Sequence, residues 1–127
     1  MIGEKLRLIK GNSECLPSPD NTFDLVFCIN VIYFWQNPSK HLQEIKRVLK
    51  PGGAFYAIFR TKESMQFMPF TQFGFTAYDE VEWIQQLTEN NFSEINHILL
   101  QEPEVVFKES KISIQSHFIT GKKESLL

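Results

Sequence analysis

The sequence predicts an α/β fold with a mainly parallel sheet, and three observations predict it. The nearly continuous apolar run Phe23–Ile29 is typical of a strand that is covered on both faces. A helical segment follows, and the turn Pro51-Gly52-Gly53 then leads into a second apolar run over residues 54–59. Strand, helix and strand at this spacing form a right-handed βαβ crossover.

The helix between these two strands has a clear start. Asn37 can cap it, and Pro38 occupies the first turn, where no backbone amide donor is needed. Its buried side is expected to be one apolar stripe, formed by Leu42, Ile45, Val48 and Leu49.

The remaining elements complete the predicted sheet. Residues 6–10 are a short strand candidate, and residues 95–100 and 112–120 are expected to close the sheet as an antiparallel pair. Asp79 and Glu82 resemble a capping box that opens a second helix. This helix should bury Val81, Ile84 and Leu87 and end in a left-handed turn at Asn90-Asn91, while the tail from Gly121 should fray.

Size and composition limit the function classes. A chain of 127 residues is expected to form one domain, residues 1–127, with an ordinary globular composition of 43% hydrophobic and 22% charged residues. The net charge of −2 gives no electrostatic reason to expect nucleic acid as a partner. Two cysteines indicate a reducing compartment, and no apolar run approaches the roughly 20 residues of a membrane span. We therefore expect a cytoplasmic protein without a membrane partner.

In a parallel α/β sheet, ligands bind beyond the carboxyl ends of the strands. Three such ends are readable: Asn12-Ser13 after the first strand candidate, Ile29-Asn30 after the second and Arg60-Thr61 after the third. We expect all three at one edge of the sheet.

Two motifs then point to a family. Leu16-Pro17-x-x-Asp20-x-x-Phe23-Asp24, followed by Arg47-Val48-Leu49-Lys50-Pro51-Gly52-Gly53, resembles the C-terminal part of class I S-adenosylmethionine-dependent methyltransferases of the type 11-like kind. The resemblance covers residue 6 to about residue 120. It implies a truncated Rossmann-like sheet, S-adenosylmethionine as cofactor and methyl transfer to a small or apolar acceptor. The glycine-rich cofactor loop of the family is absent here, so the isolated chain is expected to bind the cofactor weakly or not at all and to be inactive.

The resemblance also suggests cofactor contacts. Asn12 and Ser13 match the family's acidic loop, so that the Asn12 side chain and the Ser13 amide would meet the adenine. The alternative for Asn12 is a turn former. Cys28, Ile29 and Asn30 match the segment that passes under the methionine part of the cofactor, mainly through backbone groups, although Asn30 could instead cap a local turn.

Three aromatic residues follow this segment. Tyr33, Phe34 and Trp35 occupy positions that face the transfer site in the family, where an aromatic wall suits a sulfonium cation. They could equally pack under the next helix. Tyr33 is the candidate catalytic base for a hydroxyl or amine acceptor.

Other reactive residues give weaker signals. The three histidines, His41, His97 and His117, lack metal-ligand spacing, so no metal site is expected. The cluster of Lys46, Arg47 and Lys50 is typical of a solvated helix face. The Met- and Phe-rich segment 65–75 is expected to be a lid over an apolar pocket or a surface for a partner chain.

The truncation raises a second functional hypothesis. In the family fold, strands that precede this segment lie beside the strand Phe23–Ile29, and without them that strand is an exposed apolar edge. We therefore expect a homo-oligomer that forms through this edge, by dimerisation or by an exchange of elements, unless residues 6–10 move in beside the strand. The alternative to an enzyme is a non-catalytic methyltransferase-like fragment that acts as a protein-interaction or dimerisation module.

Overall fold

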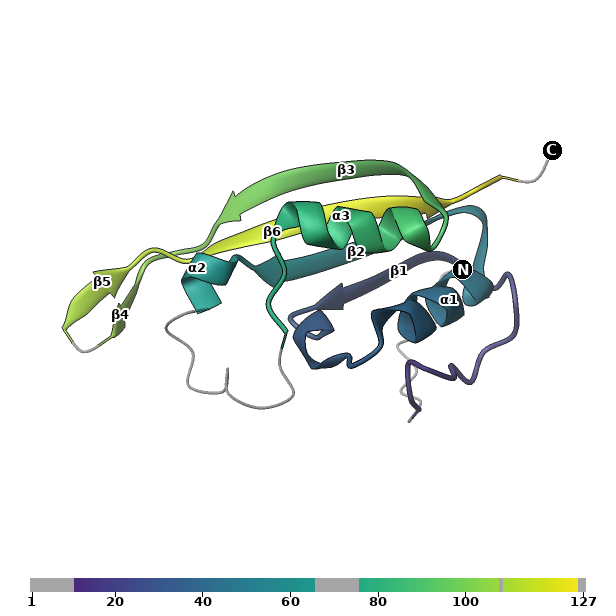
Figure 1. The fold of residues 1–127 in the computed structure, drawn as a ribbon, viewed down its shortest axis with the longest axis horizontal. Helices are drawn as coiled ribbons and strands as arrows, with labels where there is room; N and C mark the ends of the chain where they lie inside the picture. The colour runs from purple at the N-terminus through teal and green to yellow at the C-terminus, as the bar shows by residue number, and fades with distance from the viewer. Residues whose placement is uncertain (1–10, 66–75, 108, 126–127) are drawn as a thin grey trace, which may run out of the picture.

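The computed structural model describes residues 11–65, 76–107 and 109–125. Its main sheet has four strands in the order β1-β2-β6-β3, with the bounds Phe23–Ile29, Leu49–Arg60, Gln115–Lys123 and Phe92–Gln101 (Figure 1). β1 and β2 are parallel, and β6 is antiparallel to both β2 and β3. Three strands thus run in one direction and β6 opposes them, which confirms the α/β class and the closing antiparallel pair. The strand candidate at residues 6–10 lies outside the described residues.

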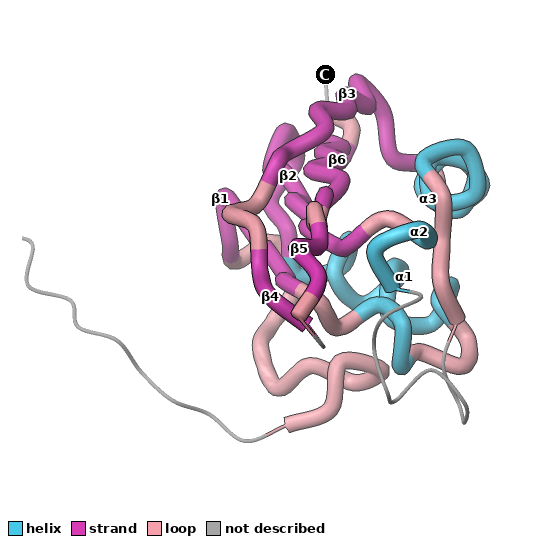
Figure 2. Tube along the Cα trace, turned by 90° about the vertical axis from the view of Figure 1, so that its left-hand side faces the viewer, coloured by secondary structure: helices cyan, strands magenta, loops and turns pink. Residues whose placement is uncertain are grey.

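The helices lie on one side of this sheet. They are the 3₁₀ turn η1 (Ile32–Phe34), α1 (Pro38–Val48), α2 (Lys62–Met65) and α3 (Glu80–Glu89). Figure 2 shows α1, α2 and α3 on the same face, and none of the described helices covers the other face. The expectation that β1 is covered on both faces is therefore wrong for the described residues. Phe27 and Ile29 of β1 remain 63% and 51% exposed.

The first helix gives way to β2 without a loop. α1 ends at Val48 and β2 begins at Leu49, which pairs with Phe23 of β1. The next pair joins Leu25 to Ala54, so residues 50–53 bulge out of the ladder. Gly52 adopts a positive φ of 83° there, a conformation that glycine tolerates best. Asn37 is the N-cap residue as expected, but its side chain makes no capping hydrogen bond.

The core lies between the sheet and the helices. Its largest fully buried side chains include Trp83, Tyr33, Phe55, Phe59, Leu42 and Leu87. The capping box of α3 is confirmed, because the Asp79 side chain accepts from the Glu82 amide at 2.8 Å and Glu82 accepts from the Asp79 amide at 2.9 Å. The expected buried face of α3 is wrong at Val81, which is 67% exposed, while Trp83 takes the buried position.

Two features at the C-terminal end were not expected. A short hairpin of β4 (Val105–Phe107) and β5 (Ser110–Ile112) projects from the end of the sheet (Figure 1). The tail does not fray at Gly121, which is buried within β6.

The left-handed turn after α3 is confirmed at Asn91, with a φ of 63°. Within the described residues, no helix has both the length and the apolar character needed to cross a membrane.

Candidate functional site

A pocket of about 390 Å³ opens between the loop that precedes β1, β1 itself, the segment that follows β1, and Ile45 of α1. Three of the predicted site residues, Ser13, Cys28 and Trp35, line it. Its other walls are mainly apolar and consist of Gly11, Leu16, Pro17, Val26, Phe27, Val31, Ile45 and Phe55. A mainly apolar hollow of this size with a few polar groups is typical of a small-molecule site.

His41 joins two of the predicted residues into one wall. The Ser13 hydroxyl lies 2.6 Å from His41 Nδ1, and the ring of His41 is stacked on Trp35 with centroids 4.4 Å apart and planes within 2°. Burial lowers the pKa of His41 below its ordinary value of 6.5, while the nearby Glu14 carboxylate acts in the opposite direction. His41 was not among the predicted site residues, because no sequence motif links it to a serine 28 residues away.

A second group fixes the loop onto α1. The Glu44 carboxylate accepts from the Leu16 amide at 2.7 Å. Arg47 donates to Glu44 at 2.8 Å, to the Leu16 carbonyl at 3.0 Å and to Asp20 at 2.7 Å. The guanidinium therefore holds both ends of the segment from Leu16 to Asp20, so Arg47 is a structural anchor and not simply part of a solvated face.

Cys28 contributes an apolar wall. Burial raises the pKa of its thiol to about 12, so the sulfur is protonated at neutral pH. A protonated buried thiol is a weak nucleophile.

Tyr33 and Asn30 form a separate polar group at the carboxyl ends of β1 and β2. The Tyr33 hydroxyl donates to Asn30 Oδ1 at 2.8 Å and accepts from the Arg60 amide at 2.5 Å. Asn30 has a positive φ of 55°, and its amide donates to the Ile58 carbonyl at 2.8 Å. Burial raises the pKa of Tyr33 to about 12. The expected meeting of strand ends is confirmed for Ile29-Asn30 and Arg60.

The other predicted site residues do not line the pocket. Asn12 is exposed, and its side chain accepts from the Glu14 amide at 2.8 Å, which is the turn-forming role named as its alternative. Ile29 and Phe34 are about half exposed and lie outside the pocket lining. The Phe34 ring meets Tyr33 edge-on at 6.1 Å. The lid or partner role of segment 65–75 falls outside the described residues, apart from Met65, which is buried.

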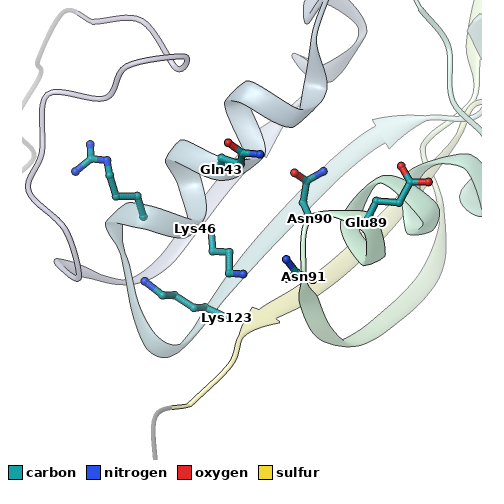
Figure 3. A pocket seen from close by; sticks show the side chains of 7 residues that line it. Gln43, Lys46, Glu89, Asn90, Asn91 and Lys123 are labelled. Atoms are coloured by element: carbon teal, nitrogen blue, oxygen red, sulfur yellow. The ribbon is translucent and has the colours of Figure 1, made fainter.

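A second hollow of about 380 Å³ lies at the opposite end of β1 and β2. Figure 3 shows Gln43, Lys46, Asn90 and Lys123 around it. Lys123, one of the two lysines that line this hollow, donates hydrogen bonds to Asn21 Oδ1 and to the Leu49 carbonyl, both at 2.9 Å. Because Lys123 contacts Leu49, the first residue of β2, this polar hollow lies far from the carboxyl ends of the strands, where a ligand is expected.

The other two histidines come together although they are 20 residues apart in sequence. His97 Nε2 lies 2.9 Å from His117 Nδ1, and Glu80 Oε2 lies 3.7 Å from the same nitrogen. The sequence spacing gave no sign of this group, because the contact arises from the pairing of β3 with β6.

Comparison with known proteins agrees with this architecture. Residues 2–57 match the methyltransferase domain family. The chain is 43% identical over 68 residues to demethylmenaquinone methyltransferase from Symbiobacterium thermophilum, covering 54% of this chain and 26% of that protein. It is 39% identical over 54 residues to sterol 24-C-methyltransferase ERG6B from Gibberella zeae, covering 42% of this chain and 14% of that protein.

The fold is shared more widely than the sequence. A SAM-dependent methyltransferase from Thermotoga maritima is similar in structure, with a TM-score of 0.73 and 21% identity, over 91% of this chain and 63% of that one. The aligned segments span about a quarter or less of the two sequence relatives.

Proposed function

We propose that this chain forms one wall of an S-adenosylmethionine site. The proposal starts from the match of residues 2–57 to the methyltransferase domain family and from the methyltransferase fold of the chain. The proposed reaction is methyl transfer to a small or apolar acceptor, as part of a longer enzyme. The names of the two relatives, a quinone and a sterol methyltransferase, favour such an acceptor. The observation that carries the proposal is the pocket that brings Ser13, Cys28 and Trp35 together.

The chemistry of the pocket fits part of this cofactor. Leu16, Pro17 and Val31 offer apolar contacts suited to a flat base, while the Trp35 ring suits a cationic sulfonium. Ser13 offers the polar contact, and its hydroxyl is oriented by His41. Because the lining includes no carboxylate or charged donor, we expect the described residues to bind the cofactor weakly on their own.

The reaction asks little of the protein beyond alignment. Bound S-adenosylmethionine supplies a methyl group on a sulfonium, which is already activated for displacement. The protein then contributes by orienting the two reactants and excluding water. We propose that Tyr33 does not act as a base but fixes the carboxyl ends of β1 and β2, since its hydroxyl is bonded to Asn30 and to the Arg60 amide and its pKa is raised to about 12.

Calorimetric titration with S-adenosylhomocysteine tests this proposal. We expect saturable millimolar binding that Val31→Glu weakens by about tenfold or more, because it places a carboxylate at an apolar wall of the pocket. Val106→Glu is the matched control, since Val106 is exposed on the distant hairpin. Asn12→Ala should leave binding unchanged, because Asn12 does not line the pocket. Absence of saturable heat, or equal weakening by the control, would contradict the proposal.

A second proposal is self-association, and the bare face of the sheet favours it. Ile29, Ile58, Phe118 and Ile98 lie side by side across the four strands, and Phe27 and Tyr56 form the next row. A further hollow of about 350 Å³ follows β1, where Phe23, Leu25 and Phe27 contribute to its lining. Since β1 is an edge strand among the described residues, a second copy can cover both its edge and this face. Light scattering should then give a dimer mass.

A further inference from the structure

Three potential metal ligands converge from three elements of the fold. Glu80 is the first residue of α3, His97 lies on the edge strand β3, and His117 lies on its neighbour β6. His117 is directly opposite Leu99, so His97 is its diagonal neighbour on the same face of the sheet. α3 lies over β6 (Figure 1), and the carboxylate of its first residue, Glu80, comes within 3.7 Å of His117 Nδ1.

The ligand atoms lie close to the spacing of a metal site, and the two imidazole nitrogens are at hydrogen-bonding distance from each other. Zinc binds imidazole nitrogen and carboxylate oxygen at roughly 2.0–2.2 Å, which places neighbouring ligand atoms about 3–3.5 Å apart. Here His117 Nδ1 lies 2.9 Å from His97 Nε2 and 3.7 Å from Glu80 Oε2, and one ligand atom from each residue falls within 4.8 Å of the others. The Glu80 side chain is 46% exposed and can rotate to close the longer distance.

We propose that Glu80, His97 and His117 bind a divalent transition-metal ion of the zinc type. Two imidazoles and one carboxylate leave at least one coordination position for water or a ligand, as in open zinc sites. His117 is the fixed member, because it is buried and its ring packs on Phe59 with centroids 5.1 Å apart. His97 is exposed, so the ion would have access from solvent.

The position of this site in the sheet suggests what it could serve. Ser116, the neighbour of His117, pairs with Arg60 at the carboxyl end of β2, and Arg60 in turn bonds Tyr33. The proposed metal site therefore lies level with the carboxyl ends of β1 and β2. Its residue His117 is on β6, which is two strands away from β1 in the sheet. A cation there would meet an anionic or chelating group of a molecule bound at this edge.

Titration of the metal-free chain with Zn²⁺ tests the proposal, with Co²⁺ as a spectroscopic probe. The exposed Cys15 is a competing thiol, so the measurements use a Cys15→Ser background. We expect one ion per chain, visible absorption bands of low-coordinate Co²⁺, and a rise in Tm with Zn²⁺ concentration. His97→Ala and Glu80→Gln should each weaken binding by more than about tenfold.

Two matched variants separate this site from adventitious binding. Asn96→Ala changes the exposed neighbour of His97 on β3, and His41→Gln removes the one histidine outside the cluster. Both should keep the affinity for Zn²⁺ and the Co²⁺ spectrum. His97 is exposed, so its replacement should leave the fold intact, as circular dichroism would verify. Unchanged Zn²⁺ affinity in His97→Ala, or loss of binding in His41→Gln, would overturn the proposal.

Discussion

The Ser13 hydroxyl lies 2.6 Å from Nδ1 of His41 and thereby links the loop before β1 to the first turns of α1. The link matters because both residues flank the same pocket: Ser13 lines it, and His41 supports Trp35 from behind by parallel stacking. A change in the charge of His41 therefore acts on the wall of the proposed cofactor site.

The first prediction concerns pH. Because burial lowers the pKa of His41 below 6.5, the unfolded chain binds more protons than the folded chain between the two pKa values. The contribution of His41 is therefore fully present above pH 6.5 and is lost as pH falls through the folded pKa. We expect the free energy of unfolding, measured with urea, to decrease from about pH 8 to about pH 5.5.

His41→Gln provides the comparison, since glutamine can still bond Ser13 but does not titrate. The variant should lose part of the pH dependence while costing about 0.5–1.5 kcal/mol at neutral pH, because the stacking of the His41 ring on Trp35 is lost. An identical pH dependence in both proteins would contradict the prediction.

The second prediction concerns the anchor at Arg47. Arg47→Met removes the donors that hold the Leu16 carbonyl and Asp20, so the loop should open more often. A glutamate-specific protease should then cut after the exposed Glu14 faster than in the wild type. Lys40→Met is the control, because Lys40 is an exposed lysine on the same helix and should not change the cleavage rate.

Local signals explain how much of the fold was predictable. The capping box of Asp79 and Glu82 involves residues three apart, and the apolar stripe of α1 repeats within one helix. Such features depend only on residues that are within one or two helical turns of each other, so the sequence alone reveals them. The bounds of β1 were predictable for the same reason, as a nearly continuous apolar run.

What covers an element is not a local property. Val81, Ile84 and Leu87 follow one helical repeat, but the buried side of α3 is that of Trp83 and Leu87, and Val81 is left exposed. The site shows the same division: Ser13, Cys28 and Trp35 were identified through the family resemblance, whereas His41 and Arg47 act across 28 to 31 residues. Such contacts depend on how α1 packs against the loop before β1, which the spacing of residues along the chain does not reveal.

The third prediction tests the buried face of α3. Leu87 is fully buried, so Leu87→Ala should lower the free energy of unfolding by about 2–5 kcal/mol through lost burial and the cavity left behind. Val81→Ala should change it by less than about 0.5 kcal/mol, because Val81 is on the solvent side. Urea denaturation of the two variants checks the ranking, and equal losses would show that α3 packs with a different face.

The fourth prediction concerns the bare face of the sheet. Phe27 is 63% exposed in the middle of β1 and sits in a row with Tyr56 of β2, so a second copy that covers this face must bury its ring. Phe27→Glu places a charge in that interface, and we expect it to shift the chain from dimer to monomer in light scattering. The fold should persist, since Phe27 is largely exposed and is not part of the buried core. Val106→Glu is again the control, because Val106 is even more exposed but lies on the separate hairpin. A wild-type chain that is already monomeric at high concentration, or a Phe27→Glu variant that stays dimeric, would show that this face is not where two copies meet.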